Sequence, residues 1–231
     1  MHEHLSEIYS ERFSNTEEKR KEQIWQILVS HFFQRYVPTD GSVLDLGTGN
    51  GEFINSVEAE RKFAVDLNPD SRNKLIPAVE FVETNSTNLS MIANQSIDTV
   101  FTSNFFEHLP NAESLIDTLK ECRACLKPTG TLLVLIPNIK YVKEDFWDYL
   151  DHTLPLTHRS MVEALQLAKF DVTEVYPRFL PYTIKNRRIH LPLWSLKIYL
   201  KAQWLWPIFG KQMLVIARPS ELTNGLPSNK I

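Results

Sequence analysis

The apolar and polar positions of the chain follow two patterns. Ile24, Ile27, Leu28 and Phe32 recur at helical spacing, with charged residues gathered before them, and predict a helix over residues 17–36. Farther along, short apolar runs bounded by turn residues predict strands, and longer periodic stretches between them predict helices. The predicted strands are residues 43–46, 62–66, 79–82, 97–102, 131–136, 171–176 and 212–217, and the predicted helices are residues 52–59, 111–126 and 158–169.

Strands and helices therefore alternate along most of the chain. This order is typical of βαβ units, in which a parallel sheet carries helices on both faces. The 231 residues are enough for one sizeable core. We predict a helical segment at residues 1–40 and one α/β domain at residues 41–218. The polar tail, residues 219–231, contains Asn, Gly, Pro and Ser and is expected to be disordered.

Composition restricts the compartment and the kind of site. No apolar run approaches the roughly 18 residues of a membrane span, and the polar N-terminus has no signal-peptide core, so we expect a cytoplasmic protein. Cys122 and Cys125 are the only cysteines, which excludes a disulfide framework. They lie in a predicted helix without a second pair or a histidine at ligand spacing. We expect both in the core and predict no metal site.

Residues 177–211 differ in charge from the rest of the chain. They hold seven lysines and arginines and no acidic residue, whereas the other positions carry 18 basic and 28 acidic residues. Residues 185–209 mix these charges with aromatic residues, which suits peripheral contact with anionic lipid, or with a lipid-linked anion, at the inner membrane face. Packing on the core and a homo-oligomer interface are the alternatives. No nucleic-acid partner is expected, because the rest of the chain is acidic and contains no known RNA-binding module.

A glycine loop follows the first predicted strand. Gly47, Gly49 and Gly51 form a G-x-G-x-G pattern, which lets the backbone approach a ligand and aims helix N–H groups at it. Dinucleotide enzymes prefer G-x-G-x-x-G. Asp45, inside the strand, would repel a pyrophosphate and suits a ligand with a cationic group. Asp66 ends the second strand, where a carboxylate can accept both hydrogen bonds of a ribose diol.

Four motifs in order carry a resemblance to a known family. They are VLDLGTGNGEF (residues 43–53), AVDLNPD (64–70), FEHL (106–109) and LKPTGTLLVLIPN (126–138). This set resembles class I S-adenosylmethionine-dependent methyltransferases. Residues 151–172 are similar to bacterial members found with sugar and polysaccharide biosynthesis. The resemblance implies a three-layer, Rossmann-like α/β fold with a mostly parallel seven-stranded sheet and an antiparallel last strand.

The resemblance also implies how the methyl donor, S-adenosylmethionine, is held. The three glycines of the loop would bind the amino-acid end of the donor, with Asp45 close to its ammonium group. Asp66 would take the ribose hydroxyls, and Leu67 would pack on the adenine face.

Two further pairs of residues complete the implied donor site. Asn85 and Ser86 follow the third strand, where the family has an aspartate for the adenine amino group, and an asparagine carbonyl can accept that bond. Ser103 and Asn104, leaving the fourth strand, would line the methionine part.

Three histidines are candidates for the catalytic base that a hydroxyl acceptor needs. His108 follows the fourth strand, and Glu107 and His108 could instead orient the next helix. His152 and His158 flank a loop expected over the same edge of the sheet, and Asp151 would raise the basicity of His152. A structural role is the alternative for each.

The expected function is methyl transfer from S-adenosylmethionine to an oxygen of a small molecule. A sugar or polysaccharide precursor follows from the resemblance, while quinone-like or lipid-like acceptors stay open. The alternative of another class is a protein that binds the donor without turnover and acts through its basic, aromatic segment.

Overall fold

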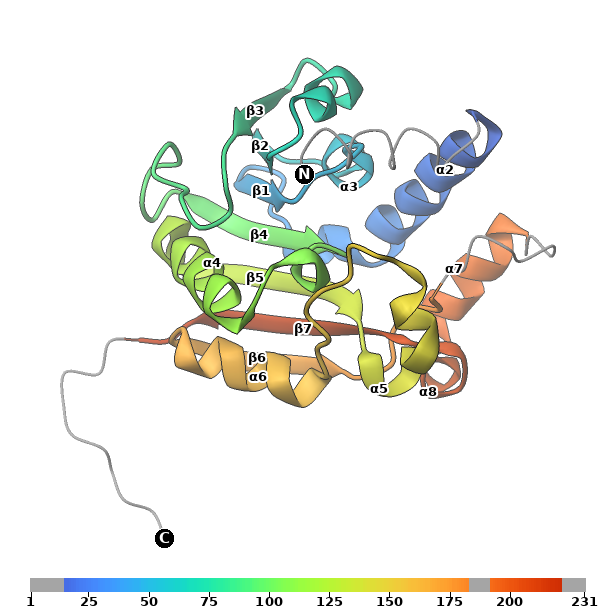
Figure 1. The fold of residues 1–231 in the computed structure, drawn as a ribbon. Coiled ribbons are helices and arrows are strands. Elements are labelled where there is room, and N and C mark those ends of the chain that lie inside the picture. The colour runs from blue at the N-terminus through green and yellow to red at the C-terminus, as the bar shows by residue number, and fades with distance from the viewer. Residues whose placement is uncertain (1–14, 183–191, 222–231) are drawn as a thin grey trace, which may run out of the picture.

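Seven strands form a single sheet in the order β3-β2-β1-β4-β5-β7-β6 (Figure 1). The computed structural model describes residues 15–182 and 192–221. All neighbouring strands are parallel except β7, which runs antiparallel to both β5 and β6. The predicted fold class is therefore confirmed. The strands are β1 (Ser42–Leu46), β2 (Arg61–Asp66), β3 (Val79–Glu83), β4 (Ile97–Ser103), β5 (Leu126–Pro137), β6 (Phe170–Tyr176) and β7 (Gln212–Pro219).

The central strands are apolar on both sides and separate two cores. In β5, Leu132 and Val134 pack into one core, whereas Leu133 and Leu135 pack into the other. Successive side chains of a strand point to opposite faces, so a continuous apolar run fits a strand that is covered twice.

One face is covered by α4 (Ala112–Cys125) and α6 (His158–Leu167). The Asn111 side chain accepts a hydrogen bond from the Ser114 amide at the start of α4, and Thr157 and Ser160 form a capping box at the start of α6. Figure 1 shows both helices along the same side of the sheet. Cys122 and Cys125 are buried in this core as free thiols, as the sequence predicted.

The other face carries α2 (Asn15–His31), η1 (Phe33–Tyr36) and α3 (Glu52–Ser56). The continuous helix predicted over residues 17–36 is wrong at its end, because the backbone leaves the helical region at Phe32, with φ −138° and ψ −60°. Phe32 and Phe33, on either side of this break, are both buried in the second core. The helix after the glycine loop also ends earlier than predicted.

Part of the basic segment packs on this second core. Its helices are α7 (Leu193–Lys201), η5 (Gln203–Leu205) and α8 (Trp206–Phe209). Leu200 and Trp206 are buried there, and the Trp206 ring centroid lies 4.8 Å from that of Phe179. Residues 1–14, 183–191 and 222–231 lie outside the described residues, and with them most of the tail predicted to be disordered. Within residues 15–182 and 192–221, no helix is both long and apolar enough to cross a membrane.

Phe33→Ala is expected to lower the free energy of unfolding by about 3–5 kcal/mol, measured by urea denaturation. Phe33 is fully buried, and its ring lies 5.2 Å from Phe101 and 6.2 Å from Trp25 between centroids. Leu150→Ala, at a side chain 92% exposed, is the control and should change stability by less than about 0.5 kcal/mol. Equal stability of the two variants would contradict a structural role for the segment before β1.

Candidate active site

The glycine loop turns tightly between β1 and α3. Gly47, Gly49 and Gly51 have φ of 72°, 54° and 74°, a left-handed conformation that favours glycine. A Cβ added at Gly47 would lie 2.5 Å from the Phe105 ring, whereas one added at Gly49 would have no atom within 4 Å. The loop is therefore packed against the protein at Gly47 and open at Gly49.

Hydrogen bonds tie this loop to the end of β2. The amides of Gly47 and Thr48 donate to the Val65 carbonyl over 2.9 and 3.1 Å. The Gly49 amide donates to Asp66 Oδ2 over 2.8 Å, and the Asn68 amide donates to Asp66 Oδ1 over 2.9 Å. Both carboxylate oxygens are thus held in place while each retains a lone pair for a diol. Leu67, next in the chain, exposes 45% of its surface.

Asp45 lies beneath the loop and is buried. Its Oδ2 accepts a hydrogen bond of 2.8 Å from the Thr48 hydroxyl. Burial raises the pKa of the Asp45 carboxyl to about 7, and the nearby Glu52 and Asp66 carboxylates act in the same direction. A cationic ligand group beside Asp45 would favour its ionised form. Sequence reasoning missed Thr48, because its position between two glycines gave no sign that its hydroxyl turns inward.

The side chains predicted to contact adenine have partners within the protein. Asn85 Oδ1 accepts hydrogen bonds from the amide and the hydroxyl of Thr87, both 3.1 Å long. The buried Ser86 hydroxyl lies 2.8 Å from Thr118 Oγ1 of α4. The geometry gives these side chains a local structural role, and their contact with the donor stays a prediction.

Ser103 and Asn104 lie where β4 ends. Asn104 takes a left-handed φ of 48°, and its Nδ2 donates to Ser103 Oγ over 3.1 Å. Asn104 Oδ1 also accepts a longer hydrogen bond, 3.4 Å, from Gln212 Nε2 of β7. The pair therefore sits at the same edge as the glycine loop, because β1 and β4 are parallel neighbours.

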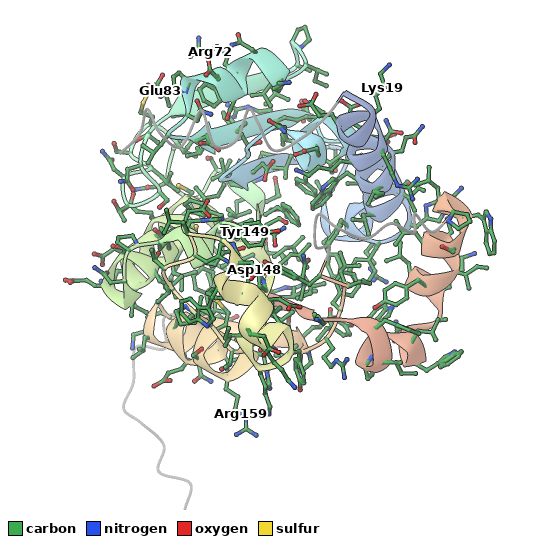
Figure 2. The ribbon with its side chains drawn as sticks, turned by 45° about the vertical axis from the view of Figure 1, so that its right-hand side comes forward. Lys19, Arg72, Glu83, Asp148, Tyr149 and Arg159 are labelled. Atoms are coloured by element: carbon green, nitrogen blue, oxygen red, sulfur yellow. The ribbon has the colours of Figure 1, made fainter. Side chains whose placement is uncertain are left out.

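A second group of side chains gathers just beyond this point. Glu107 and His108 belong to η3 (Phe106–His108), and His152 follows η4 (Lys143–Asp148). One carboxylate oxygen of Glu107 and one ring nitrogen of each histidine all lie within 4.8 Å of one another. Figure 2 labels Asp148 and Tyr149 near the middle of the view, on the segment that brings His152 in.

Backbone hydrogen bonds clamp these two distant segments together. The amides of Thr153 and Leu154 donate to the Glu107 carbonyl over 2.8 and 3.0 Å. The Thr153 hydroxyl donates to the Leu109 carbonyl over 2.7 Å. The loop after His152 is thereby fixed on η3.

Both histidines use Nδ1 to bind a backbone carbonyl. His108 Nδ1 lies 3.0 Å from the Asp151 carbonyl oxygen, and His152 Nδ1 lies 2.9 Å from that of Phe146. Since a carbonyl only accepts, Nδ1 carries the proton and Nε2 the lone pair in each neutral ring. The Asp151 carboxylate, predicted to act on His152, has its Oδ2 3.4 Å from His108 Nδ1.

Glu107 is a buried acid. Only 2% of its surface is exposed, and among the described residues its Oε2 has no hydrogen-bond partner. Burial raises the pKa of the Glu107 carboxyl to about 8, and the Asp151 carboxylate adds to this effect. Sequence reasoning considered Glu107 only for orienting a helix. The sequence gives one sign of a role in the site: Glu107 stands next to His108, four residues after β4 ends.

His158 stands apart from this group. It begins α6, and its Nδ1 accepts a hydrogen bond of 3.1 Å from Asn138 Nδ2. Burial, then Lys140 and Arg159, lower its pKa. Of the three predicted histidines, the structure brings together His108 and His152.

Comparisons with known proteins identify the family and the fold. A family model described as a methyltransferase domain matches residues 17–172. A structure of an S-adenosylmethionine-dependent methyltransferase from Archaeoglobus fulgidus has a TM-score of 0.64 at 21% identity, with 86% of this chain and 94% of that chain covered. No match was found among functionally curated proteins.

Two other structures share the fold at similar levels. A Haloferax volcanii methyltransferase, solved with a methyltransferase activator, has a TM-score of 0.65 at 17% identity over 90% of this chain and 95% of that chain. A methyltransferase from Bacillus halodurans has a TM-score of 0.62 at 18% identity, with 85% of this chain and 98% of that chain covered. Because the family model covers more than half of the chain, the protein belongs to the methyltransferase-domain family and is a class I methyltransferase that uses S-adenosylmethionine.

Proposed function

We propose that the protein methylates an oxygen of a small-molecule acceptor, with a sugar or polysaccharide precursor as the first class to test. The observation that carries the proposal is the convergence of Glu107, His108 and His152 just after β4, at the edge of the sheet where the glycine loop also lies. A sulfonium methyl is already electrophilic, so the enzyme has to align the acceptor and assist loss of its proton. A neutral hydroxyl needs that assistance.

The donor-binding residues we propose are those of the glycine loop and the end of β2. The open side of Gly49 would receive the amino-acid end, with Asp45 near the ammonium group. The fixed Asp66 carboxylate would accept hydrogen bonds from the ribose, and exposed Leu67 would pack on adenine. These roles fit the loop because each polar atom is already oriented before the donor binds.

The proposed reaction is a single displacement. The acceptor oxygen forms a bond to the methyl carbon as the carbon–sulfur bond breaks. The electron pair of the broken bond stays on sulfur, which gives S-adenosylhomocysteine. The hydroxyl proton leaves toward the side of the acceptor that faces Glu107, His108 and His152. Family membership favours this transfer over the alternative of binding without turnover.

Asp66→Ala is expected to weaken S-adenosylmethionine binding by about tenfold or more, since a hydrogen bond to a charged group contributes about 1.5–3 kcal/mol. Titration calorimetry measures the affinity. Asp117→Ala, at an exposed carboxylate of α4, is the matched control and should bind like the parent protein. Equal affinities of the parent protein and both variants would place the ribose elsewhere.

His152→Asn is expected to lower kcat by about 100-fold or more, the usual contribution of proton-transfer groups, with donor affinity unchanged. The assay follows S-adenosylhomocysteine formation with sugar precursors, and NMR locates the new methyl ether. His158→Asn is the control outside the group. Donor binding without acceptor-dependent turnover would favour the binding-module alternative, and methyl groups found on nitrogen or carbon would contradict an oxygen acceptor.

We further propose that α7 and α8 contact anionic lipid, which would suit a lipid-linked acceptor. Trp194, Lys197, Ile198 and Lys201 lie at the i, i+3, i+4 and i+7 positions of one helix face, and all four are exposed. Trp204, Ile208 and Phe209 are each more than half exposed. Apolar and basic side chains on one outward surface are typical of interfacial helices.

The parent protein is expected to float with liposomes that contain anionic lipid, and Trp194→Ser combined with Trp204→Ser is expected to abolish flotation, since both exposed indoles are removed. Leu167→Ser, at an exposed apolar residue of α6, is the control. Absence of flotation with either neutral or anionic liposomes, or a dimer disrupted by the same double variant, would contradict the lipid assignment.

A further inference from the structure

We propose that Glu107, His108 and His152 bind a divalent transition-metal ion. This inference rests on the proposed function and deepens it, because it assigns the group beside the donor to an ion instead of to a free base. It also replaces the sequence-based expectation that the chain has no metal site.

The ligand atoms of the three side chains converge. Two imidazole nitrogens and one carboxylate oxygen lie within 4.8 Å of one another. Ligand atoms around an ion at about 2.1 Å stand about 3 Å apart, so side-chain movements of about 1–2 Å would complete the coordination. Three protein ligands also leave a position for substrate, as in catalytic metal sites.

Hydrogen bonds to the second ring nitrogen orient both histidines. Metal-binding histidines usually donate their second ring N–H to a carbonyl or carboxylate, which fixes the ring and the tautomer. His108 Nδ1 has the Asp151 carbonyl at 3.0 Å and the Asp151 carboxylate at 3.4 Å. His152 Nδ1 has the Phe146 carbonyl at 2.9 Å. Because these bonds take the Nδ1 proton of each neutral ring, Nε2 is the nitrogen that would bind the ion.

Burial of the Glu107 carboxylate costs free energy. An ionised carboxylate removed from water requires a counter-charge or hydrogen bonds. Within residues 15–182 and 192–221, Oε2 of this side chain has no hydrogen-bond partner, and Glu107 belongs to none of the ion pairs found between lysines and carboxylates there. A divalent ion would supply the missing charge.

The rigidity of the site supports the same conclusion. The Thr153 and Leu154 amides hold the Glu107 backbone, and the His152 ring lies 4.7 Å from that of Phe146 and 4.8 Å from that of Tyr149, between centroids. Preorganised ligands lose little entropy on binding. Two imidazoles with one carboxylate favour zinc, iron, cobalt or manganese over magnesium, which prefers oxygen ligands.

The ion would act on the acceptor. A hydroxyl oxygen bound to the ion would become more acidic and would release its proton to solvent water. The oxygen then attacks the methyl carbon, and the carbon–sulfur electrons pass to sulfur, as in the displacement above. His108 and His152 would thus assist loss of the acceptor proton by holding the ion.

The test is metal binding by the untagged, full-length protein after removal of metals with EDTA. Calorimetric titration with Zn²⁺, repeated with Co²⁺ and Mn²⁺, is expected to show one site in the parent protein. Glu107→Gln, His108→Asn and His152→Asn should each weaken binding by about 10–100-fold or more. His158→Asn, a histidine outside the group, should bind like the parent protein.

Failure of this proposal is distinguishable from failure of the proposed function, because the titration needs neither donor nor acceptor. Metal binding that is lost in the three variants supports the inference even if the acceptor proves to be a different compound. No binding of any of the three ions, or equal binding by the parent protein and the variants, would overturn it. Full methyl transfer by metal-free protein in the presence of EDTA would also overturn the role of the ion.

Discussion

The parallel pairing of β1 with β2 and β4 decides where the glycine loop, Asp66 and Asn104 lie. Because parallel neighbours end on the same side of a sheet, the residues that follow these three strands share one edge. The glycine loop, Asp66 and the turn at Asn104 therefore leave the sheet at one edge. Ligands of open α/β sheets bind at this edge because the loops there carry backbone groups that the sheet does not use.

Much of this arrangement follows from local sequence. Short apolar runs predict the buried strands, and the glycine loop predicts left-handed backbone that few other residues tolerate. The antiparallel last strand came from resemblance, since nothing in residues 212–217 alone indicates its direction. The break in the first helix was not predictable from periodicity, because it depends on two adjacent phenylalanines reaching one aromatic cluster.

The part of the site that sequence reasoning predicted least is the group around Glu107. Glu107 is buried, and the amides of residues 153–154, far along the chain, hold its backbone carbonyl. Tertiary structure also determines which histidine Asp151 contacts. Backbone carbonyls orient the rings of His108 and His152, and the Asp151 carboxylate lies beside His108. The spacing of residues along the chain does not predict contacts between loop backbones, although the sequence did point to His108, His152 and Asp151 as candidates.

The basic segment is connected to the same site at both of its ends. Near its start, Tyr182 packs with Val142 and Phe146, and burial followed by the nearby Tyr149 and Glu107 raises its pKa. At its end, Lys211 Nζ lies 2.9 Å from Asp145 Oδ2 of η4. Both flanks of the basic segment therefore contact residues 142–146, which precede His152 in the chain.

A crystal structure of the complex with S-adenosylhomocysteine tests the central claim most directly. The account predicts that the ribose hydroxyls bind the Asp66 carboxylate, that the amino-acid end lies over Gly49, and that the sulfur faces Glu107, His108 and His152. A nucleoside bound away from Asp66, or a sulfur turned away from this group, would contradict it.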